Sequence, residues 1–352
     1  MISAHGNLQG NPLRRLNTLT AMICGAIRTN KSDLESLGSE LPQDIDSESR
    51  FKHVKRWLIN TYTDYDISFL PFIEPILENY IAQNKEMVFS IDGSDVAQGC
   101  TVLMISLTVY KRAIPICWLV KECKKGHLPA QMHLDVFTIL NKLLKGYQNV
   151  VVLGDGEFDN GEVITKCADW KWRFVFRTAK STKIYDGQEE YPIKYLEPPG
   201  NEKFFIAHDV AYTKERYGPV NAIVWTERRW DDPIYLLSNF ELSYDLAFYY
   251  RKRWSIETLF GDIKSRGFNI HKSKLTDAKR VAKLIIVISL AYILVFKLGQ
   301  REQNSPLRSK VTRKDRMDLS IFTIGKKLIK HCLKHSIKIV FSFSKNCFIS
   351  TG

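Results

Sequence analysis

The chain has 352 residues and a formal net charge of +13, and 45% of its residues are hydrophobic, 12% aromatic and 25% charged. This composition is typical of a folded globular protein and excludes a disordered, collagen-like or low-complexity chain. The length allows one large domain or two to three smaller ones, with enough chain to bury an apolar core.

The seven cysteines are scattered along the chain and odd in number. The first residues, MISAHGNLQGNPLRR, do not contain the apolar segment of a secretory signal peptide. We therefore expect reduced thiols and a cytoplasmic location rather than a disulfide framework.

The positive charge lies in the last third of the chain. Residues 250–352 hold 23 Lys and Arg against 6 Asp and Glu, a net charge of +17. Residues 1–249 hold 28 against 32, a net charge of −4. A basic segment on a nearly neutral body indicates a polyanionic partner, most simply nucleic acid. A solvated basic tail that serves solubility is the alternative.

Residues 1–75 are expected to be helical. Apolar residues recur at helical spacing over 13–27 and again over 51–58, where basic residues lie between them. The second segment predicts either a small DNA-binding helical module or a helical subdomain that packs on the rest of the chain.

A different pattern begins at Met87, where short apolar runs alternate with turns. Predicted strands, rich in β-branched and aromatic residues, cover 88–91, 101–110, 114–120, 150–153 and 172–176. Predicted helices cover 130–147 and 160–169. The order strand, strand, strand, helix, strand, helix, strand, with an antiparallel start and a parallel continuation, is that of an RNase H-like fold.

Residues 178–240 interrupt this pattern with proline, glycine and aromatic residues, and predict a β-rich insertion with short strands at 204–207, 222–225 and 234–238. The chain is predicted to be helical again over 243–266 and in a long apolar helix over 277–298. The apolar run 284–296 in that helix is shorter than the roughly 20 residues of a membrane span. We therefore expect a buried core helix and no membrane.

Two aspartates follow predicted strands. Asp92 ends the first strand and Asp155 ends the fourth, and a glycine follows each. In an RNase H-like sheet these strands are neighbours, so both carboxylates would lie at the edge where open α/β sheets place their sites. Carboxylate oxygens suit Mg²⁺, although Asp-Gly is also a common turn dipeptide.

A third carboxylate comes from the predicted helix over 243–266. Four of its polar residues lie at offsets of 0, 3, 7 and 14, namely Tyr250, Arg253, Glu257 and Lys264. At about 100° per residue these offsets fall within an arc of about 60°. The helix would present one carboxylate between two cations and a phenol, where the cations suit phosphate oxygens and the carboxylate suits a metal. An ordinary amphipathic helix with surface charges is the alternative.

The spaced motif Tyr-x2-Arg-x3-Glu-x6-Lys, within YRKRWSIETLFGDIKSRGFNI, resembles the DDE transposases of bacterial insertion sequences, in the insertion-sequence-four (IS4-like) group. The contexts SIDGSD at Asp92 and VVLGDGEFDNGE at Asp155 are similar to that family as well. The resemblance covers about residues 12–330. The gap of 102 residues between Asp155 and Glu257 accommodates the β-rich insertion that the family carries before its catalytic glutamate.

The resemblance implies a transposase that cuts transposon ends and joins them to target DNA. The triad that holds two Mg²⁺ ions, or Mn²⁺ in their place, would be Asp92, Asp155 and Glu257. Two metals activate the attacking oxygen and stabilise the leaving oxygen of a phosphodiester displacement. The family often cuts the second strand through a hairpin, and its members act as dimers on terminal inverted repeats in the bacterial cytoplasm.

The resemblance also implies contacts to DNA. Positions that grip phosphates near the cleaved end are matched by Tyr250, Arg253 and Lys264. Trp254 matches a position linked to a flipped base near the hairpin. Trp225 and Trp230 are further candidates for stacking on an unpaired base, a contact worth about 1–3 kcal/mol, although core packing is the favoured interpretation of Trp225.

The predicted fold class is α/β, with an RNase H-like core of a mixed five-stranded sheet and helices, a β-rich insertion, and helical N-terminal and C-terminal regions. The expected divisions are a helical N-terminal domain and DNA-binding candidate (1–80), the first part of the core (81–178), the insertion (179–241), the second part of the core (242–298) and a basic C-terminal tail (299–352). Two other functions stay open at this point: a purely hydrolytic RNase H-like nuclease, and a DNA-binding transposase derivative without catalysis.

Overall fold

The computed structural model describes residues 8–42, 44–123, 126, 128–196, 203–227, 232–240, 246–313 and 318–339. The N-terminal region consists of the helices α1 (Gly10–Thr29), α2 (Leu34–Leu37), α3 (Ser47–Ile59), α4 (Tyr65–Ser68) and α5 (Leu70–Ala82). Helix α3 begins after Asp46, whose carboxylate accepts a hydrogen bond from the Ser49 backbone N–H. The helices predicted over 13–27 and 51–58 are confirmed.

The core follows the predicted order of elements. Its strands are β1 (Met87–Ala97), β2 (Cys100–Val109), β3 (Arg112–Glu122), β4 (Val150–Gly154) and β5 (Arg173–Arg177), and its first helices are α6 (Ala130–Leu144) and α7 (Gly161–Asp169). Strands β1, β2 and β3 pair antiparallel, whereas β1, β4 and β5 pair parallel. The resulting order, β3-β2-β1-β4-β5, is the RNase H-like order that the sequence predicts.

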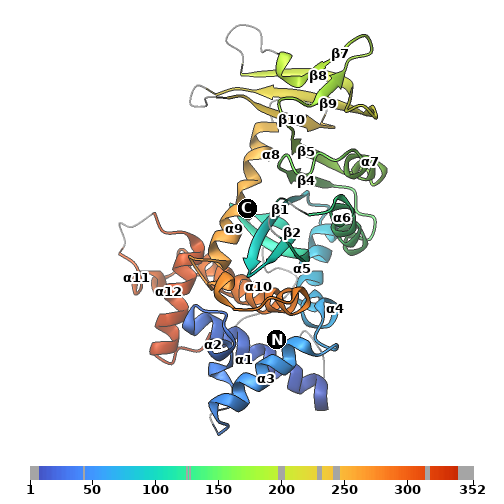
Figure 1. Cartoon of the computed structure of the whole chain (residues 1–352). Coiled ribbons are helices and arrows are strands. Elements are labelled where there is room, and N and C mark those ends of the chain that lie inside the picture. The colour runs from blue at the N-terminus through green and yellow to red at the C-terminus, as the bar shows by residue number, and fades with distance from the viewer. Residues whose placement is uncertain are drawn as a thin grey trace.

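The insertion extends the core sheet. It contributes β6 (Lys183–Tyr185), β7 (Glu190–Pro192), β8 (Phe204–Tyr212), β9 (Tyr217–Trp225) and β10 (Ile234–Ser238). Strand β10 pairs antiparallel with β5, so the ten described strands form one sheet. The insertion strands lie at one end of the molecule and helices α1 to α3 at the other (Figure 1).

Helices cover both faces of the core sheet. Helices α6 and α7 lie on one side, and α8 (Leu246–Lys252) and α9 (Trp254–Ile263) lie on the other (Figure 1). The face under α8 is lined by alternate strand residues that pack with Leu246 and Tyr250: Val88, Val151, Leu153 and Val175. Because strand side chains alternate between faces, residues an even number of positions from these four on the same strand also face α8.

The long apolar helix α10 (Ala278–Arg301) is a core helix. It is long and apolar enough to cross a membrane, but 83% of its most apolar window is buried inside the protein. It packs against α1, β3 and α12 (Ile321–Lys334). The prediction of a buried helix over 277–298 is therefore confirmed.

The basic C-terminal region is more ordered than a tail. After the short helix α11 (Pro306–Ser309), helix α12 buries one apolar side, formed by Phe322, Ile324, Leu328 and Ile329. The expectation of a tail over 299–352 is wrong for α12, because its amphipathic pattern packs it onto α10. Residues 340–352 lie outside the described part of the chain.

Candidate active site

The two predicted aspartates lie side by side on adjacent parallel strands. The β1–β4 ladder pairs Ser90 with Leu153, and this register continued by two residues places Asp92 beside Asp155. Adjacent strands are about 4.8 Å apart. By alternation both aspartates share the sheet face of Val88 and Leu153, which is the face that α8 covers. Asp92 is 4% exposed.

The prediction that Asp92 ends the first strand is wrong. Strand β1 runs on to Ala97 because β2 still offers pairing partners, with Asp92 opposite Met104 and Asp95 opposite Thr101. Only the parallel pairing with β4 ends at Ser90. Asp92 therefore stands on a rigid strand just beyond that ladder, whereas Asp155 follows the last residue of β4 as predicted.

The predicted helix over 243–266 is two helices that meet at Arg253. The Arg253 N–H donates to the Tyr250 carbonyl at 3.0 Å and the Ile256 N–H donates to the Arg253 carbonyl at 3.2 Å. These are i to i−3 bonds, which tighten the helix at the junction. The single helical wheel assumed for the motif is therefore wrong in detail, and residues 241–245 lie outside the described part of the chain.

The junction nevertheless brings three motif residues together. The Arg253 Nη2 atom lies 2.6 Å from the Glu257 Oε1 atom, in an ion pair whose side chains are 8% and 48% exposed. The Arg253 guanidinium also lies 5.6 Å from the centre of the Tyr250 ring. Tyr250 is buried beneath this pair.

The charge of Asp155 reaches the same group of residues. Burial raises the pKa of the Tyr250 phenol, Arg253 and Arg177 oppose the rise, and Asp155 adds to it. Burial lowers the pKa of Arg253, but the charges of Tyr250, Glu257 and Asp155 raise it above the usual value. The phenol therefore stays neutral and the guanidinium stays charged near neutral pH, within range of the Asp155 carboxylate.

Lys264 joins the site from the far end of α9. Its Nζ atom lies 2.6 Å from the Ser94 Oγ atom. Ser94 is two residues after Asp92 on β1, so both side chains point to the same face of the sheet. The ammonium group is thus held on the strand that carries the first aspartate.

The tryptophans fall into three cases. Trp254 is 38% exposed and its ring meets the Tyr250 ring edge-on at 5.8 Å. Trp225 is fully buried and stacks on Phe204, so core packing is confirmed for it. Trp230 lies outside the described residues.

A match to a protein family shows which proteins carry this arrangement of residues. Residues 116–294, half of the chain, match the transposase DDE domain. The chain belongs to the DDE transposase family. The match begins after Asp92 and includes Asp155 and the complete Tyr-x2-Arg-x3-Glu-x6-Lys motif. The chain is thus a transposase, an enzyme that cleaves and rejoins DNA phosphodiester bonds.

The transposase is similar to a piggyBac transposase synaptic complex with hairpin DNA, at 13% identity over 100% of this chain and 79% of that chain, with a TM-score of 0.47. It is also similar to Ciona intestinalis endonuclease V in complex with DNA, at 15% identity over 63% of this chain and 99% of that chain, with a TM-score of 0.26. The comparison with curated proteins gives no match.

The transposase has a further cation at the site that the sequence analysis missed. The β4–β5 ladder pairs Gly154 with Phe176, so Arg177 lies beside Asp155 at the next position. Both residues line an open cleft of about 450 Å³ together with Lys180 and Tyr235. Arg177 ends β5 and Asp155 follows β4, so it is the register of the two strands that brings the two residues together.

Two acidic neighbours of Asp155 have separate contacts. The Glu157 N–H donates to Asp155 Oδ1 at 3.1 Å. Asp159 accepts a hydrogen bond from the Thr178 hydroxyl, and its pKa is raised, chiefly by burial. Helix α7 is capped by Asn160, whose side chain accepts a hydrogen bond from the Glu162 N–H.

DDE transposases use divalent metal ions, and the residue types here fit such ions. Hard carboxylate oxygens suit Mg²⁺ and Mn²⁺, and Asp92 and Asp155 place two carboxylates at one edge. Among the described residues, however, no group of three His, Cys, Asp or Glu side chains is close enough to hold a metal ion. Glu257 is instead held by its ion pair with Arg253.

Proposed function

We propose that this transposase cuts the ends of its own element and joins them to target DNA with Asp92, Asp155 and Glu257 as its catalytic carboxylates. The observation that carries the proposal is the placement of Asp92 beside Asp155 on the sheet face that α8 covers. The Arg253–Glu257 pair follows on the same side, within reach of the charge of Asp155.

The three carboxylates would hold two Mg²⁺ ions, for which Mn²⁺ substitutes. When bound, the metals activate the attacking oxygen and stabilise the leaving oxygen of an in-line displacement at phosphorus. Water first attacks the phosphodiester at the element end, the bond from phosphorus to the 3′ oxygen breaks, and a 3′ hydroxyl is released. That hydroxyl then attacks a phosphodiester of the opposite strand, which forms a hairpin and releases the 3′ hydroxyl of the flanking DNA. Water opens the hairpin and restores the 3′ hydroxyl of the element end. This hydroxyl attacks a phosphodiester of target DNA and displaces a target 3′ hydroxyl.

The motif residues beside Glu257 supply contacts to the DNA. Arg253 and Lys264 are fixed cations on the face of the two aspartates and suit the phosphate oxygens around the scissile bond. Tyr250 keeps its phenolic proton, and because it is buried beneath the Arg253–Glu257 pair, its hydroxyl would donate to a phosphate only after that pair separates. The half-exposed ring of Trp254 offers a face on which an unpaired base of the hairpin can stack.

A second DNA contact is proposed for the N-terminal helical domain. A groove of about 640 Å³ between α1 and α3 is lined by the basic residues Arg14, Arg15, His53 and Arg56. Such a groove suits a phosphate backbone. It favours the DNA-binding interpretation of this domain, with the terminal inverted repeats of the element as its ligand.

We propose further that the enzyme acts as a homodimer, in which each subunit cuts one transposon end, in the bacterial cytoplasm. The net positive charge of residues 250–352 supports engagement of long DNA. We propose that the chain divides at 80, 178, 241 and 298, so that the N-terminal domain binds the element ends and the two core parts carry the chemistry.

The test is a cleavage assay on labelled duplex taken from the DNA that flanks the gene, with Mg²⁺ or Mn²⁺, resolved on a denaturing gel. We expect nicks at one position followed by hairpin and joined products. Asp155→Asn should abolish all of them and keep DNA binding. Asp169→Asn, on the exposed side of α7, is the matched control and should cleave like wild type.

Two outcomes would overturn the proposal. Binding without any product in either metal would assign the chain to a DNA-binding derivative. Nicking at scattered positions without joining would assign it to a hydrolytic nuclease.

A further inference from the structure

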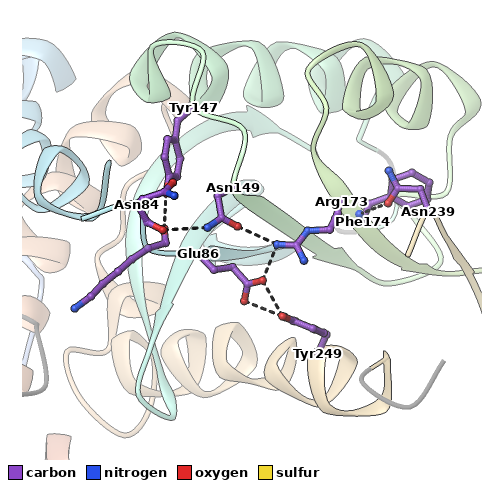
Figure 2. Close-up of polar contacts among 9 residues, drawn as sticks. Asn84, Glu86, Tyr147, Asn149, Arg173, Phe174, Asn239 and Tyr249 are labelled. Carbon is purple, nitrogen blue, oxygen red and sulfur yellow. Dashed lines mark hydrogen bonds and ion pairs between the residues drawn. The ribbon is translucent and has the colours of Figure 1, made fainter. Parts of the chain in front are cut away.

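A bonded cluster lies at the edge of the core sheet opposite the two aspartates. Glu86 directly precedes β1, Asn149 directly precedes β4, and Arg173 is the first residue of β5. Figure 2 shows their side chains converging, with Tyr249 of α8 reaching the same point from the covering helix. The cluster therefore joins the starts of three core strands to α8.

Glu86 is the centre of this cluster. The Tyr249 hydroxyl lies 2.7 and 2.9 Å from the two Glu86 carboxylate oxygens and donates its proton to them. The Arg173 Nη2 atom lies 2.7 Å from Glu86 Oε2 and 3.0 Å from Asn149 Oδ1. A carboxylate that accepts from both a phenol and a guanidinium makes charge-assisted bonds, which are the stronger kind.

Aromatic contacts support the same attachment. The Arg173 guanidinium lies 5.2 Å from the centre of the Phe240 ring, and the Phe240 ring lies 4.9 Å from the Tyr249 ring. Phe240 is the last described residue before α8, so the chain is anchored on both sides of the segment 241–245. Helix α8 is thus tied to the starts of β1 and β5 by hydrogen bonds and ring packing.

The elements that meet at Glu86 are the ones that carry the proposed catalytic residues. Strand β1 leads from Glu86 to Asp92, and β4 leads from Asn149 to Asp155. Helix α8 leads from Tyr249 to the junction at Arg253, and α9 continues from there to Glu257. Strands and helices transmit position because their lengths per residue are fixed. A slip of α8 along the sheet would therefore move Glu257 relative to the two aspartates.

We propose that Glu86 and Tyr249 are positioning residues of the transposase: their bond sets the placement of α8 and α9 on the sheet, and so the reach of Glu257 to the metals held by Asp92 and Asp155. The inference rests on the proposed function of these carboxylates. Neither Glu86 nor Tyr249 touches the DNA or the metals in this proposal. Without their bond, a smaller share of molecules holds Glu257 in place, and the apparent metal affinity falls by that fraction.

Tyr249→Phe tests the proposal with a minimal change, because it removes the hydroxyl and keeps the ring that packs on Phe240. The matched control is Tyr147→Phe. The Tyr147 hydroxyl donates to the Lys85 carbonyl at 2.9 Å at the same edge of the sheet and has no bond to α8 in the described structure (Figure 2). Glu86→Gln is the conservative variant, since an amide oxygen still accepts from Tyr249.

Two measurements are made on the full chain. The first is the Mg²⁺ concentration that gives half-maximal nicking of element-end DNA, and Tyr249→Phe should raise it about three- to tenfold. Glu86→Gln should raise it less than about threefold, and Tyr147→Phe should leave it unchanged. The second is hydrogen exchange by mass spectrometry of metal-free protein, where Tyr249→Phe should speed exchange in peptides from 246–263 but not in those from α10.

The outcomes separate this inference from the proposed function. If wild type cleaves with Mg²⁺ and Tyr249→Phe has the same metal dependence and the same exchange as wild type, the positioning role is wrong and the catalytic assignment stands. An equal effect of Tyr147→Phe would reduce the cluster to general stability and also overturn the inference. If wild type does not cleave but the exchange result holds, the attachment of α8 is real and the proposed function fails.

Discussion

The two edges of the core sheet differ in how their polar groups are bonded. At the amino ends of β1, β4 and β5, Glu86 and Arg173 bond each other and their neighbours. At the opposite edge, the buried Arg253 Nε atom and both ring nitrogens of His133 have no hydrogen-bond partner among the described residues. The comparison indicates that one edge holds the elements in place and the other keeps polar groups that a ligand can satisfy, at some loss of stability.

Among the variants that keep all three proposed catalytic carboxylates, loss of Arg253 should have the largest effect. Arg253→Ala removes the partner of Glu257 and a fixed cation from the site. We expect hairpin formation and joining to slow about 100-fold, equivalent to about 2.7 kcal/mol in the barrier, while the half-saturating Mg²⁺ concentration stays within about threefold. Product time courses on a denaturing gel measure both quantities.

The control for this change is Arg251→Ala, which removes an arginine two residues away that pairs with Glu227. It should leave the products unchanged. A loss of metal affinity as large as the loss of rate would give Arg253 a part in metal binding, and an unchanged product pattern would remove it from the site.

A change in the N-terminal helices should affect binding and spare the chemistry. Arg56→Ala removes one cation from the groove between α1 and α3. We expect weaker binding to every DNA sequence and a reduction of about 0.9 in the slope of log affinity against log salt concentration. Fluorescence anisotropy at several salt concentrations measures the slope.

Arg28→Ala serves as the comparison on the same domain, since Arg28 is half exposed at the other end of α1 and pairs with Glu40. It should keep the wild-type slope. A slope that Arg56→Ala does not change would leave the groove without a function in DNA binding.

The order of the core elements was predictable because each has its own local signal. Apolar runs such as 150–153 and the helical spacing over 130–147 specify strand and helix without reference to the rest of the chain. The place at which the insertion strands join the core sheet was not predictable. The pairing of β10 with β5 joins residues about 60 positions apart and depends on which edge of the sheet is open. A helical C-terminal region was predicted, but the packing of α12 was not, because an apolar stripe at helical spacing predicts a helix and not the helix on which it packs.

The candidate site was predictable in its residues and less so in its geometry. Asp155 and the motif around Glu257 stand out in the sequence, and both lie within the family match. The extension of β1 through Asp92 depends on β2, and the break at Arg253 depends on bonds that a helical wheel does not contain. Arg177 was missed because its proximity to Asp155 arises only from the register of β4 with β5.

The two edges should also differ, by a smaller amount, in how much their polar residues contribute to the free energy of unfolding. Arg173→Met removes the ion pair with Glu86 and should lower the free energy of unfolding by about 1 kcal/mol, given that both side chains are partly exposed. Asp92→Asn removes a buried charge and should leave stability equal or higher while it abolishes cleavage. Urea unfolding in metal-free buffer measures both, and a large loss of stability in Asp92→Asn would show that this carboxylate holds the fold as well.

The smallest expected effect concerns His133, which is buried on α6 with its ring 5.0 Å from that of Phe158. Burial lowers the pKa of His133, and the charge of Asp155 only partly opposes this. The unfolded chain, with a histidine pKa near 6.5, therefore binds more protons than the folded chain once the pH falls below that value. Its contribution to stability is fully present above about pH 6.5 and is lost as the pH falls toward the lower folded pKa.

We expect the free energy of unfolding of wild type to decline between about pH 7 and 5, and His133→Phe to flatten part of that decline by less than about 1 kcal/mol. Urea unfolding at each pH in metal-free buffer measures it, with His208→Gln, an exposed histidine on β8, as the control that should keep the wild-type profile. If His133→Phe also keeps that profile, protonation of His133 does not contribute to the pH dependence of the free energy of unfolding. The contrast between the two edges would then rest on Arg253 alone.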